Sequence, residues 1–160
     1  MMLESLKNYL DNYQVKFVVI SHAPAYTAQG VAGLMHIPGK ELAKTIIVRL
    51  DRELVMCVLP ANFHVDLGIL KEATHAHAAT LATEEDFRDW FPQCETGAMP
   101  PFGNLYGLRV YADRSLEQDI EIVFNAGTHR ELIRMNWEDY KRLVDPIVMS
   151  FATENAAEAA

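Results

Sequence analysis

Apolar residues recur along the chain with two different periods, which separate helices from strands. Near the start, Leu3, Leu6 and Leu10 lie at helical spacing and predict an amphipathic helix over residues 2–13. Other segments are predicted as helices because a capping residue precedes them or because their apolar residues have the same helical spacing. We expect these helices over residues 27–35, 65–73, 83–91 and 137–145.

Runs of β-branched and aromatic residues predict the strands. The segment AKTIIVRLDRELVMCVLP, residues 43–60, is typical of a hairpin with a tight turn at Asp51 and Arg52. Further strands are expected over residues 16–21, 77–81, 108–113, 119–127 and 129–135. Strands and helices are interspersed, and the strand pairs have hairpin-length links. This order favours an α+β fold with a curved mixed β-sheet flanked by helices over a doubly wound parallel sheet.

Length and composition fit one compact domain. The 160 residues are 50% hydrophobic, which is enough for a core, and the apolar runs are too short to span a bilayer. We expect the domain over residues 1–150 and a flexible tail over residues 151–160, which has little to bury. Cys57 and Cys94 provide neither a disulfide framework nor a zinc site, and the first residues do not resemble a signal peptide. A cytoplasmic protein is therefore expected.

The negative charge is concentrated in one half of the chain. The net charge is −8, and residues 1–80 hold seven basic and seven acidic residues, whereas residues 81–160 hold seven against fifteen. A protein that coats nucleic acid needs many cations to neutralise phosphates, so this class is disfavoured. Contact with one nucleotide end through a few cations is still compatible with the charge.

The uncharged loop GAMPPFG, residues 97–103, has two interpretations. Pro100 and Pro101 fix two φ angles and remove two N–H donors, while the flanking glycines tolerate positive φ or a close approach of another molecule. The loop is either a stiff corner that packs Met99 and Phe102 on the core or one wall of a binding pocket.

Two polar residues stand where chemistry is plausible. Lys44 directly precedes an apolar strand, so it is either a solvated charge at a strand edge or a cation that points into a cleft. His129 follows an Asn-Ala-Gly turn, which is either a plain hairpin bend or a place where a histidine faces a pocket. His75 and His77 lack a third ligand at a recognisable spacing, and we expect no metal site. The chain also has no nucleophile elbow, Walker A loop or GxGxxG motif.

Five motifs occur together in a specific order: HAPAYTAQGVAG, GKELAKTIIV, VLPANFHVDLGIL, GAMPPFG and FNAGTHRELIRM. In this order the chain resembles the YbaK/ProX family of trans-editing aminoacyl-tRNA deacylases, which is related to the editing domain of bacterial prolyl-tRNA synthetase. The likeness extends from Phe17 to Leu143. One difference is that the proline-rich loop has a second proline and an extra glycine.

The resemblance implies roles for individual residues. The family's key lysine corresponds to Lys44, its glycine loop begins at Gly97 and its histidine corresponds to His129, and these three are the implied catalytic residues. The implied substrate-binding residues are His22, Tyr26, Thr27, Met99, Pro100, Pro101, Phe102, Gly103, Asn125 and Gly127. An aminoacyl ester is already activated, so its hydrolysis needs positioning and oxyanion stabilisation rather than a protein nucleophile, a cofactor or a metal.

The function implied by this resemblance is hydrolysis of the ester of a mischarged tRNA that carries a small amino acid. Its partners are then the acceptor end of tRNA and an aminoacyl-tRNA synthetase, with neither a membrane nor DNA involved. Two alternatives stay open. The same fold could hold aminoacyl-tRNA or a synthetase without cleaving it, or it could hydrolyse another small acyl ester.

Overall fold

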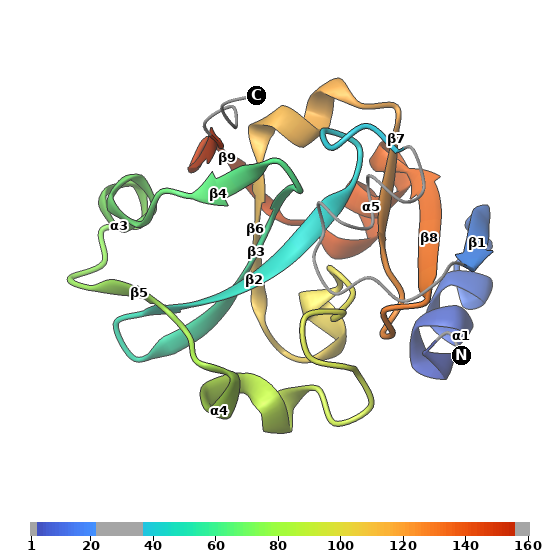
Figure 1. The fold of residues 1–160 in the computed structure, drawn as a ribbon, viewed down its shortest axis with the longest axis horizontal. Helices are drawn as coiled ribbons and strands as arrows, with labels where there is room; N and C mark the ends of the chain where they lie inside the picture. Colours follow the sequence, from blue (N-terminus) through green and yellow to red (C-terminus); the bar gives the residue numbers. More distant parts are fainter. Residues whose placement is uncertain (1–2, 22–36, 156–160) are drawn as a thin grey trace, which may run out of the picture.

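The computed structural model describes residues 3–21 and 37–155 of the chain. Its central element is a five-stranded mixed sheet with the strand order β5-β2-β3-β6-β9 (Figure 1). The strands are β2 (Ala43–Leu50), β3 (Glu53–Pro60), β5 (Ala79–Leu81), β6 (Arg109–Asp113) and β9 (Ile147–Met149). β2 and β3 form the expected antiparallel hairpin around Asp51, which has φ 53°. β6 is parallel to β3 and to β9, so the sheet is mixed.

A three-stranded antiparallel sheet lies beside the first, with the order β1-β8-β7. Its strands are β1 (Phe17–Ser21), β7 (Glu121–Asn125) and β8 (Glu131–Asn136). The two sheets are joined where Leu42 forms a parallel bridge with Val123, whose N–H donates to the Glu41 carbonyl at 2.9 Å. A small third sheet pairs β4 (Phe63–Val65) with β10 (Ala152–Glu154).

Several of the described helices begin at a residue whose side chain accepts a hydrogen bond from a free N–H group. The α-helices are α1 (Glu4–Asn12), α3 (Leu67–Thr74), α4 (Glu84–Phe87) and α5 (Trp137–Val144), and the 3₁₀ helices are η1 (Arg88–Trp90), η2 (Gly103–Leu105) and η3 (Arg114–Gln118). Asn136 accepts hydrogen bonds from two N–H groups at the start of α5. Thr83 and Asp86 form a capping box at α4.

The central strand β3 is buried on both faces. Met56 and Val58 belong to the main core, which also contains side chains of α1, α5 and β7. The alternate residues, Cys57 and Leu59, belong to a second cluster that packs under α3 and around Phe151. Burial raises the pKa of the Cys57 thiol to about 12, so this cysteine is an inert core residue.

Most predicted elements are confirmed, and three strands were not foreseen. The helix predicted over residues 27–35 lies outside the described residues. The missed strands, β4, β9 and β10, are each three residues long, too short for a periodic signal. The tail expected over residues 151–160 differs at its start, because Phe151 is buried and residues 152–154 pair with β4. None of the described helices is long and apolar enough to cross a membrane.

Candidate active site

The glycine-proline loop, which is GAMPPFG (residues 97–103) with the two residues before it, lies directly on the turn of the β7–β8 hairpin. Two backbone hydrogen bonds join them: Glu95 N–H donates to the Gly127 carbonyl at 2.9 Å, and Gly127 N–H donates to the Ala98 carbonyl at 3.0 Å. Gly127 has φ +99°, a left-handed conformation that favours glycine, and a Cβ on it would lie 3.1 Å from the Leu3 Cβ. Two motifs about 30 residues apart in the sequence thus form one structural unit.

Gly97 and His129 are neighbours within this unit. Gly97 is exposed and has φ +84°, and a Cβ placed on it would lie 3.4 Å from the His129 Cε1 atom. The His129 ring is only 5% exposed, and its Nε2 atom lies 2.6 Å from the Thr96 carbonyl oxygen. A carbonyl oxygen only accepts, so Nε2 carries a proton and donates it to this bond. The histidine therefore fixes the backbone beside Gly97.

The second half of the loop belongs to the core. Phe102 is fully buried, and its ring meets that of Tyr140 edge-on at 5.4 Å between centroids. Met99 is buried as well. A Cβ on Gly103 would lie 2.5 Å from the Val110 Cγ2 atom, so a glycine is needed there for packing. For Met99, Phe102 and Gly103 these contacts favour the stiff-corner interpretation over a pocket wall.

Tyr140 is a residue of this region that sequence reasoning missed. Its hydroxyl donates a 2.7 Å hydrogen bond to the carbonyl of Pro101, and both Pro100 and Pro101 are buried. Burial raises the pKa of Tyr140, so the hydroxyl stays protonated as a donor. Nothing in the local sequence of α5 marks Tyr140, because its partner lies 39 residues earlier in the chain.

Lys44 lies near the start of β2 and is half-buried. Its Nζ atom donates to the Ala61 carbonyl at 3.3 Å, and desolvation by burial lowers the pKa of the amine. Leu42 bridges Val123 in parallel, and Lys44 and Asn125 each stand two residues beyond that bridge. Lys44 and Asn125 therefore both lie near the junction of the two sheets, and β7 leads on to the hairpin turn that carries His129.

Asn125 has an unusual side chain for a buried residue. Its Oδ1 atom is buried and finds no hydrogen-bond donor within the part of the chain that the structure describes. Such an acceptor is available to a donor that a substrate brings. His22, Tyr26 and Thr27 are outside the described residues, so their predicted roles stay predictions. In residues 3–21 and 37–155, no three histidine, cysteine or acidic side chains lie close enough to hold a metal ion.

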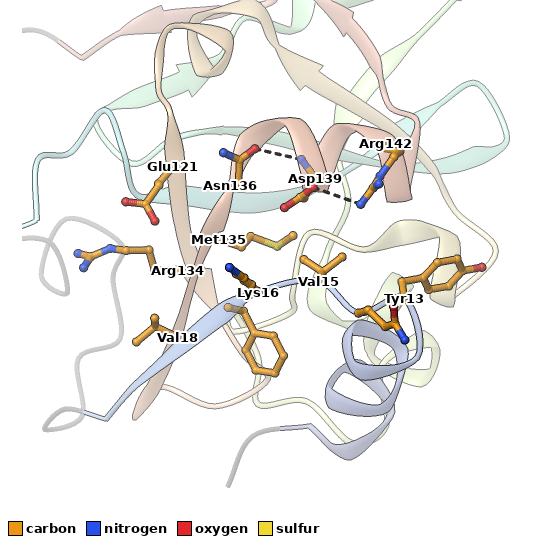
Figure 2. Close-up of a pocket in the computed structure, with 12 residues that line it drawn as sticks. Tyr13, Val15, Lys16, Val18, Glu121, Arg134, Met135, Asn136, Asp139 and Arg142 are labelled. Carbon is orange, nitrogen blue, oxygen red and sulfur yellow. Dashed lines mark hydrogen bonds and ion pairs between the residues drawn. The ribbon is translucent and has the colours of Figure 1, made fainter.

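A groove of about 610 Å³ opens at the other end of the three-stranded sheet. Figure 2 shows Lys16 and Arg134 beside it, with Arg142 paired to Asp139 at 3.1 Å. The groove lies where Phe17 pairs with Met135, whereas the turn with His129 precedes the opposite end of β8. None of the predicted site residues within the described ranges lines this groove, so it is separate from the Gly97 and His129 unit.

Two comparisons with known sequences bear on the family of this chain. A family model described as the aminoacyl-tRNA editing domain matches residues 22–143. The multifunctional Ser/Thr-tRNA deacylase ProXp-y of Escherichia coli (strain K12) is 27% identical over 140 residues, which cover 84% of this chain and 83% of that protein.

Solved structures show the same fold. The crystal structure of a candidate trans-editing enzyme for prolyl tRNA synthetase is similar with a TM-score of 0.79 and 20% identity, over 92% of this chain and 94% of the other. That of a hypothetical protein is similar with a TM-score of 0.85 and 16% identity, over 94% of this chain and 100% of the other. Because the family model extends over well more than half of the sequence, including the loop and hairpin motifs, this chain belongs to the aminoacyl-tRNA editing domain family.

Proposed function

We propose that this protein is a deacylase that hydrolyses the ester between a small amino acid and a mischarged tRNA. The observation that carries this proposal is the docking of the glycine loop on the hairpin turn, which sets exposed Gly97 against buried His129. A short, rigid backbone segment with an open glycine is suited to bind a small reacting group closely.

The Gly97 N–H is the proposed oxyanion donor. Among the described residues it makes no hydrogen bond, and the glycine is exposed, so the donor is available to substrate. Hydrolysis of an ester passes through a tetrahedral intermediate in which the carbonyl oxygen becomes negative. A donor held in place by the bond between His129 and Thr96 needs little reorganisation to stabilise that charge.

Lys44 supplies the positive charge of the proposed site. Its amine is half-buried and bonded to a single carbonyl, so it can also contact the phosphate of the terminal adenosine or the ester. Asn125 offers its unpartnered Oδ1 atom to the α-ammonium group of the amino acid. The attacking nucleophile is water, assisted by the terminal hydroxyl of the tRNA, and His129 orients the loop rather than acting as an obligatory base.

Serine and threonine esters are the proposed substrates. The relative from Escherichia coli is named for activity on Ser- and Thr-tRNA, and it is similar along most of this chain. The net charge of −8 disfavours broad contact with RNA, so we propose that the protein binds only the acceptor end, with a synthetase delivering the substrate.

The test is deacylation of seryl-, threonyl- and alanyl-tRNA by the purified protein and by Lys44→Ala. We expect hydrolysis of at least one substrate and a loss of about 10²–10³-fold in Lys44→Ala, typical of one polar group at the reacting centre. Lys71→Ala, an exposed lysine on α3, is the matched control and should retain full activity. Binding of charged tRNA without hydrolysis would instead support the non-catalytic alternative, and hydrolysis only of simple acyl esters would support the other.

A further inference from the structure

A second cavity, of about 340 Å³, lies next to the Ala61 carbonyl that accepts from Lys44, because Pro60 and Asn62 both line it. It is bordered by the turn before β2, the β3–β4 connection, η3 and the end of β10. Its lining residues are Gly39, Lys40, Pro60, Asn62, Phe63, Ser115, Gln118, Asp119 and Glu154. Lys44, Gly97 and His129 are not among them. The family motifs assign no role to the acidic residues of this cavity.

Two of the residues that line this cavity have an oxygen atom without a hydrogen-bond donor. These atoms are the Oδ2 atom of Asp119 and the Oδ1 atom of Asn62, both buried and without a partner in the described part of the chain. Asp119 is only 9% exposed. A buried carboxylate or amide oxygen that has lost water and gained no donor is costly, so such atoms indicate that something else occupies the space.

The charges around the cavity are of both signs. Asp119 and Glu154 are acidic, and Lys40 is an exposed cation that lines the same space. Lys40 and Asp119 interact electrostatically, but they form no ion pair within 4 Å. Neither charge is therefore neutralised by direct contact with the other. A divalent cation fits poorly here, because Lys40 repels it and Asp119 is the only carboxylate at the buried end.

We infer that this cavity binds a small zwitterion with a protonated amine next to a carboxylate, that is, a free α-amino acid. The ammonium group donates to Asp119 Oδ2 and Asn62 Oδ1, which satisfies both unpartnered oxygens, and the carboxylate contacts Lys40. The volume is at the lower end for ligand pockets, in keeping with a ligand of this size. The inference does not depend on the proposed deacylation, although that reaction releases a molecule of the same class.

The titration of Asp119 gives the site a pH dependence. Burial and, to a smaller extent, the nearby Glu41 charge raise the pKa of Asp119 to about 6, although Lys40 opposes the shift. Glu154 is the other titratable group that lines the cavity. A protonated Asp119 no longer attracts an ammonium ion, so binding should be present at pH 8 and lost at pH 5.

The test is titration of the intact protein with L-serine and L-alanine, followed by calorimetry and by amide chemical shifts, without tRNA. Ethanolamine and acetate serve as probes for the amine and the carboxylate alone. We expect saturable binding of the amino acids at pH 8 that is about tenfold weaker in Asp119→Asn, because a charge-assisted hydrogen bond is lost. Asp89→Asn, an exposed acid on η1, is the matched control and should bind normally. Lys40→Met should abolish the preference for serine over ethanolamine.

Two outcomes would overturn the inference. Absence of saturable binding up to roughly 10 mM ligand would mean that water alone satisfies the two oxygens. Binding that is lost in Lys44→Ala but retained in Asp119→Asn would place the amino acid in the candidate active site instead. A failure of tRNA deacylation affects neither readout, so the two proposals are tested separately.

Discussion

The hydroxyl of Tyr140, in α5, donates a 2.7 Å hydrogen bond to the carbonyl of Pro101 in the glycine-proline loop. Both partners are buried, and the rings of Tyr140 and Phe102 are in contact. This bond connects the C-terminal half of the loop to α5. In addition to the backbone bonds with Gly127, two side chains thus hold the loop, Tyr140 at Pro101 and His129 at Thr96.

Tyr140→Phe should therefore reduce both stability and deacylation. Removal of the hydroxyl leaves a buried carbonyl unpaired, which costs about 1–3 kcal/mol, and lets the loop shift relative to His129. Urea unfolding measures the first effect, and kcat and KM for seryl-tRNA measure the second. Tyr13→Phe, at an exposed tyrosine, should change neither. Normal kcat in a destabilised Tyr140→Phe protein would restrict this bond to a structural role.

Gly97→Ala and Gly107→Ala separate backbone strain from contact with substrate. Both glycines have positive φ, +84° and +72°, so each alanine should cost roughly 1 kcal/mol of stability. Only at Gly97 does the new methyl group lie near His129, because nothing lies within 4 Å of a Cβ at Gly107. We expect similar melting temperatures for the two variants, and a loss of deacylation only in Gly97→Ala that grows from alanyl- to seryl- to threonyl-tRNA.

Near-normal turnover of all three substrates by Gly97→Ala, together with a lowered melting temperature, would show that the loop is only a scaffold. The pocket assignment of Gly97 would then be wrong. The comparison is informative because both glycines are exposed and have positive φ, while only Gly97 lies next to His129.

Gly103→Ala should be the most destabilising glycine substitution in this loop. The methyl group would overlap the Val110 side chain and lie 2.8 Å from the Leu108 carbonyl oxygen, so backbone and core must both shift. Overpacking of this kind typically costs about 1–3 kcal/mol. Urea unfolding should show a larger loss than for Gly107→Ala. An equal loss in both variants would mean that the core relaxes around the added group.

His129→Ala should slow deacylation without abolishing it. The substitution removes the hydrogen bond to the Thr96 carbonyl, so the Gly97 N–H is less well positioned, but no obligatory base is lost. His129→Gln can restore a donor and should recover part of the activity. Chelators should have no effect on the wild-type protein. Inhibition by a chelator that added zinc reverses would instead point to a metal at His75 and His77.

Asp119 should make the protein less stable as the pH rises from about 4 to about 6. Burial raises the pKa of this carboxyl to about 6 in the folded protein, against an ordinary value of 3.8, so the folded state holds the extra proton in this window. The unfolded state binds fewer protons there, and the stability must fall with increasing pH. Urea unfolding at pH 4, 5, 6 and 7 should show this decrease in the wild type and not in Asp119→Asn. Identical pH profiles of stability in the two proteins would contradict a raised pKa of Asp119 in the folded state.

Local patterns in the sequence determined most of the secondary structure. The hairpin of β2 and β3, the capping of α4 by Thr83 and of α5 by Asn136, and the end of α5 before Pro146 all depend on residues within a few positions of each other. Propensity, capping and turn geometry act over such distances, so these elements could be predicted. The motifs also indicated the family, which the comparison with the editing-domain model confirmed.

Only the tertiary structure decided which residues meet. The approach of Gly97 to His129, the bond from Tyr140 to Pro101 and the parallel pairing of β3 with β6 join residues 32 to 54 positions apart, and no local pattern specifies such partners. Burial likewise depends on neighbours from elsewhere in the chain. For this reason Met99 and Phe102, apolar residues in a loop, could be assigned to the core only from the structure, and the unpartnered oxygens of Asn62 and Asp119 left no signal in the sequence.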